Sequence, residues 1–83
     1  MSITNDVLSL LYEYIDELIP EYEQLYSSVN VDSGSIAIGV KYKGMMCERV
    51  ISQTEMLSVC DIEGLCKYNI ERIKQDFIKE GLL

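Results

Sequence analysis

The first twenty residues place apolar and polar side chains with the period of a helix. Apolar residues recur about every 3.6 positions, and acidic residues fall within about 100° on the opposite side of the helical wheel. Ser2 or Thr4 can cap the start, and Pro20 cannot continue a helix because it lacks an N–H. We therefore predict an amphipathic helix over residues 5–19. Its apolar face contains Val7, Leu8, Leu11, Tyr14, Ile15, Leu18 and Ile19.

After Pro20 the pattern changes to the alternation of β-strands. Residues 24–31 alternate apolar and polar positions, and the Asp-Ser-Gly sequence at 32–34 is typical of a turn. Residues 36–43 alternate more regularly and predict a second strand. One side of that strand contains Ile36, Ile38, Val40 and Tyr42.

A third strand follows a tight hairpin at Gly44. Its alternation over residues 45–51 is less decisive, because both sides contain apolar residues. We predict that Met46 and Val50 point inward. Gly39, in the middle of the second strand, leaves a flat patch that either a helix of this chain or another backbone can cover.

The last third of the sequence is helical. The segment Ser52-Gln53-Thr54-Glu55 matches a capping box and predicts a helix start, and Asp61 can cap a second helix. The pattern leaves open whether residues 52–80 form one helix or two. Gly81 followed by Leu82 predicts a Schellman C-cap. The apolar positions with helical spacing are Ile62, Leu65, Cys66, Ile70, Ile73 and Phe77.

These elements predict one α+β domain spanning residues 1–83. We expect an N-terminal helix, a three-stranded antiparallel sheet, and one or two C-terminal helices packed on one face of the sheet. No apolar stretch approaches the roughly 20 residues that a membrane helix needs, and no signal peptide is visible. Three cysteines and no C-x-x-C motif predict reduced thiols in a cytosolic protein. The expected core residues are Tyr14, Ile15, Leu18, Ile36, Ile38, Val40, Tyr42, Ile70 and Phe77.

The net charge of −7 is concentrated in the N-terminal half of the chain. Residues 1–40 contain seven acidic side chains and no lysine or arginine, whereas residues 41–83 contain seven of each sign. A negative field of this kind repels nucleic-acid phosphates and anionic lipid. We therefore expect neither nucleic-acid nor membrane binding, and a basic protein as partner.

The residue types argue against an enzyme. The chain has no histidine, so the commonest general base and metal ligand is absent, and a cysteine or serine nucleophile lacks its usual activating partner. The five glycines form no phosphate-binding loop. The carboxylate pairs Asp16/Glu17 and Glu21/Glu23 are expected on a solvated surface. We predict no catalytic residues, no metal site and no cofactor.

Tyrosines accompany the acidic residues on the polar sides of the predicted elements. Tyr12, Tyr22 and Tyr26 either supply contact area for a partner or lie at the rim of the core, and the sequence leaves both readings open. Acidic residues of the helix and the following loop, together with one tyrosine, form the predicted partner-binding site. This site consists of Glu13, Asp16, Glu17, Glu21, Tyr22 and Glu23.

The stretch from Asp6 to Val50 resembles the YezG-type family of small acidic immunity proteins. The resemblance lies in the helix ending in Glu17-Leu-Ile-Pro-Glu-Tyr-Glu23, and in Asp32-Ser-Gly-Ser-Ile36 before an alternating strand. It implies an immunity or antitoxin protein that neutralises a nuclease toxin of a bacterial polymorphic secretion system.

Charge and resemblance together predict a protein-binding inhibitor that covers the basic active site of a nuclease. One alternative is a phage-encoded inhibitor of a host defence nuclease, such as a CRISPR effector. Another is a non-inhibitory oligomeric adaptor, for example a homodimer, that pairs through an exposed edge strand or the Gly39 face.

Overall fold

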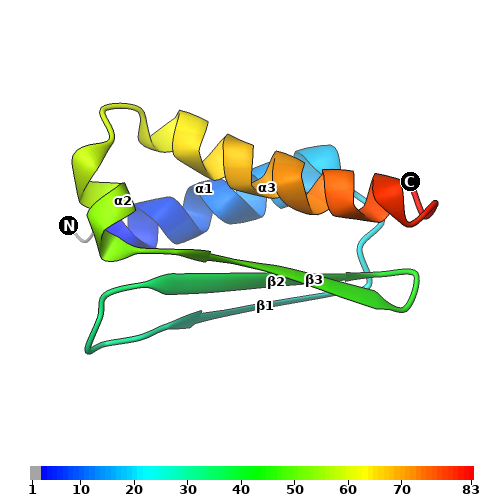
Figure 1. Cartoon of the computed structure of the whole chain (residues 1–83), viewed down its shortest axis with the longest axis horizontal. Coiled ribbons are helices and arrows are strands. Elements are labelled where there is room, and N and C mark those ends of the chain that lie inside the picture. The colour runs from blue at the N-terminus through cyan, green and yellow to red at the C-terminus, as the bar shows by residue number, and fades with distance from the viewer. Residues whose placement is uncertain (1–2) are drawn as a thin grey trace.

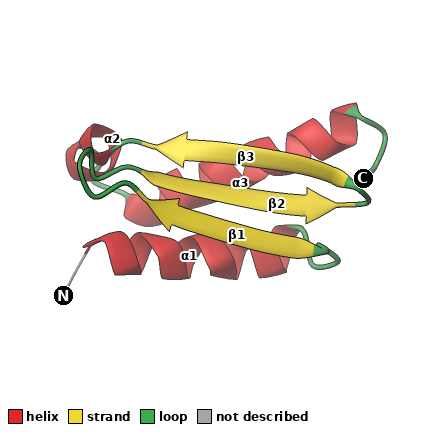
Figure 2. Cartoon of the chain, turned by 90° about the horizontal axis from the view of Figure 1, so that it is seen from below, coloured by secondary structure: helices red, strands yellow, loops and turns green. Residues whose placement is uncertain are grey.

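Three helices and three strands form two layers in the computed structural model, which describes residues 3–83. α1 and α3 cover one face of an antiparallel sheet with strand order β1-β2-β3 (Figure 1), and the opposite face is uncovered (Figure 2). The predicted α+β architecture is confirmed, and residues 52–80 form two helices. The elements are α1 (Ile3–Leu18), β1 (Gln24–Val29), β2 (Ile36–Tyr42), β3 (Met45–Ile51), α2 (Gln53–Ser58) and α3 (Ile62–Lys79).

The boundaries of α1 differ slightly from the predicted 5–19. Thr4 lies inside the helix and is therefore not its N-cap, and Ser2 lies outside the described residues. The helix ends at Leu18, after which the amide of Ile19 still donates to the carbonyl of Ile15 at 2.8 Å. Pro20 then ends the hydrogen-bonding pattern, because it has no N–H to donate.

Two side-chain caps separate α2 from α3. The capping box is present, since the Glu55 amide donates to Ser52 Oγ at 3.1 Å and the Ser52 amide donates to Glu55 Oε1 at 3.3 Å. Val59 is extended and ends α2. Asp61 then caps α3 by accepting from the amide of Gly64 at 2.9 Å. Residues 52–80 break into two helices at this point.

The end of α3 forms the predicted Schellman motif. The Gly81 amide donates to the carbonyl of Ile78 at 3.0 Å, and the Leu82 amide donates to that of Phe77 at 2.9 Å. Leu82 packs against the core, which supplies the hydrophobic contact of the motif.

The core lies between the inner face of the sheet and the two long helices. The predicted core residues are buried there, with Leu18 and Tyr14 packed at its rim. The rings of Tyr42 and Phe77 meet with centroids 5.4 Å apart. The buried apolar residues are Val7, Leu11, Ile15, Ile19, Ile36, Ile38, Val40, Tyr42, Cys47, Ile51, Met56, Cys66, Ile70, Ile73 and Phe77.

The prediction that Met46 and Val50 point inward is wrong. Both lie on the uncovered face, with 44% and 58% of their surfaces exposed. The hairpin loop contains only Lys43 and Gly44, which both have positive φ (49° and 84°), so Tyr42 pairs with Met45. Side chains of paired residues share a face, and this register directs Met45, Cys47, Arg49 and Ile51 inward.

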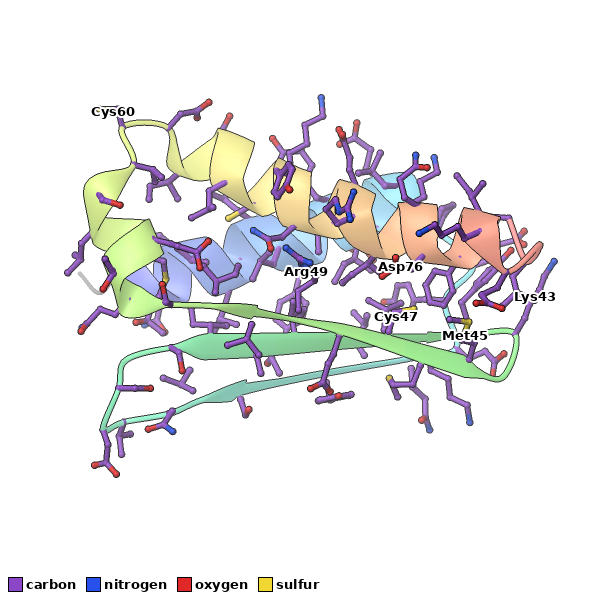
Figure 3. All side chains as sticks on the ribbon, viewed as in Figure 1. Lys43, Met45, Cys47, Arg49, Cys60 and Asp76 are labelled. Atoms are coloured by element: carbon purple, nitrogen blue, oxygen red, sulfur yellow. The ribbon has the colours of Figure 1, made fainter. Side chains whose placement is uncertain are left out.

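Arg49 is a charged residue on the inner side of β3, where it points toward α3 (Figure 3). Its Nε donates to Oδ1 of Asn69 at 3.1 Å. Asn69 is only 2% exposed, and its Nδ2 donates to the carbonyl of Leu65 at 2.9 Å. The two polar side chains therefore satisfy each other where β3 packs on α3, which makes an inward arginine tolerable.

Gly39 is covered by a side chain of its own sheet, and none of the described helices lies over it. The ring of Tyr26 lies across it on the uncovered face, and the Tyr26 hydroxyl donates to Glu48 on β3. A Cβ at position 39 would lie 2.1 Å from Cε1 of Tyr26, so only glycine fits beneath the ring. Tyr26 thus connects all three strands.

We expect Gly39→Ala to destabilise the protein by about 1–2 kcal/mol, because the methyl group displaces the ring of Tyr26 and breaks its contact with Glu48. In a Tyr26→Ala background the same substitution should be neutral or stabilising, since alanine suits a strand better than glycine. Urea unfolding of the four proteins of this double-mutant cycle measures the coupling. Equal effects of Gly39→Ala in both backgrounds would contradict the contact.

The three cysteines are free thiols in different environments. Cys66 is fully buried, and burial, followed by the charge of Glu63, raises its pKa to about 11. Burial also raises the pKa of Cys47, to which Asp76 and Glu80 contribute (Figure 3). Cys60 is exposed in the connection between α2 and α3. Of the three cysteines, Cys60 is therefore the one that a reagent in solution can reach.

We expect a thiol reagent such as Ellman's reagent to modify Cys60 rapidly in the native protein and all three cysteines in denaturant. Cys60→Ser should abolish the fast phase. Rapid modification of two or more native thiols would contradict the burial.

The raised pKa of Cys66 means that the unfolded chain loses this proton at lower pH than the folded one, so the free energy of unfolding should fall between pH 9 and about 11.

Candidate functional site

The acidic residues of α1 lie together on its solvent-exposed side. Glu13, Asp16 and Glu17 are three and four positions apart, which places them on one side of the helix, and all three are exposed. Glu21, in the loop that follows, is also exposed. We call these four residues the acidic face. Sequence and structure agree on their exposure.

No basic residue neutralises the acidic face. Within residues 3–83 one ion pair forms, between Lys67 and Glu71 on α3 at 4.0 Å. The carboxylates of the acidic face therefore have no lysine or arginine nitrogen of the described chain within 4.0 Å. Their charge is directed to solvent, where a positively charged partner can reach it.

The acidic face opposes the electrostatic preference of its helix. The C-terminal end of a helix is negatively polarised, yet the last turn of α1 holds Asp16 and Glu17 and no basic residue. Glu13 and Glu17 are also like charges at an i,i+4 spacing, which destabilises a helix by roughly 0.2–0.5 kcal/mol. These charges lower the stability of α1.

Tyr22 lies beside the acidic face. Its side chain is half-buried, and its pKa is raised first by the charge of Asp16, then by desolvation and by a hydrogen bond to the same carboxylate. The phenol therefore stays protonated and in contact with α1. The predicted association of Tyr22 with the acidic residues is present in the structure.

Glu23 is exposed but has a structural partner. Its Oε1 accepts from the amide of Gly44 at 2.9 Å, and its own amide donates to the carbonyl of Lys41 at 2.7 Å. These bonds hold the start of β1 against the β2–β3 hairpin. We therefore separate Glu23 from the other predicted site residues, because its carboxylate binds the backbone of the β2–β3 hairpin.

Two acidic residues at the start of α3, Asp61 and Glu63, act on a side chain of α1 and were not among the predicted site residues. Tyr14 packs at the rim between the two helices, and its pKa is raised first by burial and then by the charges of Glu63, Glu17, Cys66 and Asp61. Asp61 and Glu63, at the start of α3, therefore add negative charge near Tyr14. Their acidic character was visible in the sequence, but only as a helix cap and first turn.

The other two tyrosines considered as contact residues, Tyr12 and Tyr26, make internal contacts. The hydroxyl of Tyr12 forms a hydrogen bond with Ser27 on β1, and Tyr26 lies over Gly39 on the far side of the sheet. Tyr26 therefore belongs to a different surface from the acidic face. Of the three tyrosines weighed as contact residues, Tyr22 is the one whose neighbour is an acidic-face residue.

One open pocket of about 90 Å³ lies at the end of α1. Ligand pockets usually measure about 300–1,000 Å³. Over residues 3–83 no three histidine, cysteine or carboxylate side chains converge on a point where a metal ion would fit. In the same residues no helix combines the length and apolar character needed to cross a bilayer.

Comparison with known proteins gives no match to a family model, a curated protein or a solved structure. The relationship to the YezG-type family stays an expectation from residues 6–50. The function is therefore inferred from the residues at the surface.

We expect Glu17→Lys to stabilise the protein by roughly 0.5–1 kcal/mol, because it places a cation at the negative end of α1 and pairs with Glu13. Thermal or urea unfolding measures the change. Asp32→Lys is the matched control, since it changes the net charge equally but lies in the exposed β1–β2 turn outside a helix. An equal gain in both variants would assign the effect to net charge and remove the local argument.

Proposed function

We propose that this protein is a small acidic inhibitor that binds another protein, and that it acts in the cytosol as an immunity or antitoxin protein against a nuclease toxin. The observation that carries the proposal is the acidic face, whose carboxylates are exposed, have no lysine or arginine nitrogen of residues 3–83 within 4.0 Å, and lower the stability of α1. The three free thiols are consistent with a reducing compartment.

A nuclease is the class of partner that this surface fits best. Its active site must hold phosphates and is therefore positively charged. An acidic protein that docks there neutralises this charge and blocks access of the nucleic acid, and complementary potentials accelerate the encounter. The inhibitor needs no chemistry of its own, in agreement with a histidine-free chain and a pocket of about 90 Å³.

The acidic face equally supports the first alternative, in which the protein is a phage-encoded inhibitor of a host defence nuclease. The physical argument is identical for both, and the neighbouring genes distinguish them.

A specific observation favours a second class, the oligomeric adaptor. The outer face of the sheet has no helix over it (Figure 2) and exposes Met46 and Val50. β1 and β3 are edge strands, which other chains can extend. Self-association in solution without a basic partner would support this class.

The first test is affinity capture from the native lysate with the tagged protein at low and at high salt. We expect one basic nuclease to be retained in near-equal amount at low salt and to be depleted at high salt, because exposed charges are screened. Added stoichiometrically, the protein should then abolish the activity of that nuclease. Recovery of the protein alone would refute the inhibitor and favour the adaptor.

The second test reverses the charges of Glu13, Asp16 and Glu17 to lysine. We expect association with the captured partner to slow by roughly tenfold or more at low salt and to lose most of its salt dependence. The control reverses Asp32, Glu71 and Glu80, which are exposed and lie outside α1, with the same change in net charge. Equal slowing in both triple variants, measured by stopped flow, would remove the acidic face as the binding surface.

A further inference from the structure

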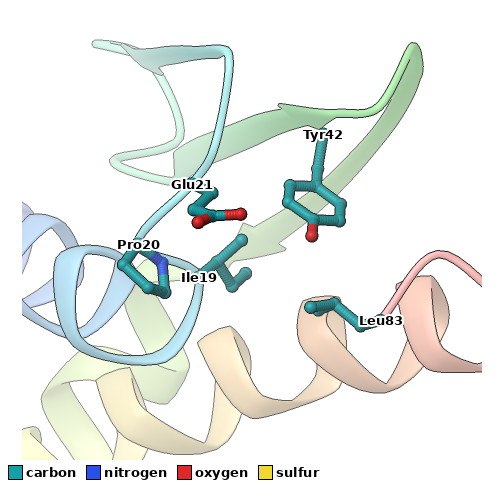
Figure 4. A pocket seen from close by; sticks show the side chains of 5 residues that line it. All are labelled: Ile19, Pro20, Glu21, Tyr42 and Leu83. Carbon is teal, nitrogen blue, oxygen red and sulfur yellow. The ribbon is translucent and has the colours of Figure 1, made fainter.

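A small pocket lies beside the acidic face where α1 ends. Figure 4 shows the carboxylate of Glu21 and the ring of Tyr42 directed toward the same space, with Leu83, from the segment after α3, on its other side. The remaining walls are Ile19 and Pro20, so the lining is mostly apolar with one carboxylate at the rim. The pocket joins the end of α1, the end of β2 and the segment after α3.

The size of the pocket limits its occupant to a single side chain. Its volume is about 90 Å³. Drug-sized and cofactor ligands need several times more space. A narrow apolar pocket open to solvent instead suits an anchor residue of another protein.

The charge of the pocket selects a cationic side chain. Glu21 has no lysine or arginine nitrogen of residues 3–83 within 4.0 Å, and the last carbonyls of α1 add partial negative charge at this end. Nζ of Lys43 already lies 5.3 Å from the centroid of the Tyr42 ring, so the attraction for a further cation comes from Glu21 and the end of α1 and not from this ring. A positive charge is therefore favoured at the rim.

We propose that the pocket binds one lysine side chain of the basic partner, an inference that rests on the proposed function. The aliphatic stem packs along Ile19, Pro20 and Leu83, and the ammonium reaches the carboxylate of Glu21. Lysine fits better than arginine, because its stem is unbranched and its charge is compact, whereas the guanidinium is broad and planar. The pocket thus fixes the position of a partner that the acidic face attracts.

NMR titration of the ¹⁵N-labelled protein tests this directly. The probes are the capped tripeptide acetyl-Gly-Lys-Gly-amide and its norleucine analogue, which keeps the stem and lacks the charge. We expect the lysine probe to shift the amides of Ile19, Glu21, Tyr42 and Leu83 saturably, and to bind roughly three to five times more tightly than the norleucine probe. Equal binding of both probes, or shifts spread over α1 with none at the pocket, would overturn the proposal.

The variant Glu21→Gln should weaken the lysine probe by the same factor and leave the norleucine probe unaffected. Asp32→Asn is the matched control, because it removes one exposed carboxylate in the β1–β2 turn and should change neither. An equal loss in the control would show that net charge, and not the pocket, binds the probe.

Different experimental outcomes would refute the lysine-binding pocket and the proposed inhibitor function. If a basic nuclease is captured but Glu21→Gln binds it with unchanged affinity, the pocket is refuted and the inhibitor stands. If the lysine probe binds the pocket but no basic protein is captured, the site is supported and the inhibitor fails.

Discussion

The arrangement of this molecule depends on the burial of one face of β2. Its inner side chains are fully or almost fully buried, and each buried aliphatic side chain contributes roughly 1.5–3 kcal/mol. A three-stranded sheet cannot bury this face alone, and α1 and α3 together cover it. The consequence is one covered and one open face of the sheet, and an α1 whose charged side must face solvent (Figure 1).

Local sequence signals predicted most of this fold because they act within a few residues. The capping box at Ser52, the cap at Asp61 and the Schellman motif at Gly81 are local hydrogen-bond patterns, and each is present. The facing of β3 was mispredicted because apolar residues occupy both of its sides. The two-residue loop before Met45 determines which side chains of β3 face the core, because it fixes the register. In this register Arg49 points inward and contacts Asn69.

The site was predictable to the extent that it lies on one helix. Periodicity alone places Glu13, Asp16 and Glu17 on the exposed side of α1. Contacts between distant segments could not be predicted from spacing: the carboxylate of Glu23 accepts from the amide of Gly44, and Tyr12 of α1 forms a hydrogen bond with Ser27 of β1. Such contacts depend on how the elements pack, and the spacing of residues along one element does not encode them.

Helix electrostatics argue that the acidic face serves an external partner. In α3 the chain follows the helix dipole, with an aspartate cap and Glu63 at the start and Lys79 in the last turn. α1 breaks this rule at its C-terminal end, although solubility alone could be met by a mixture of charges. Where a sequence otherwise obeys local rules, a local violation is expected at a functional site. The contrast between the two helices therefore favours recognition over simple solvation as the role of these carboxylates.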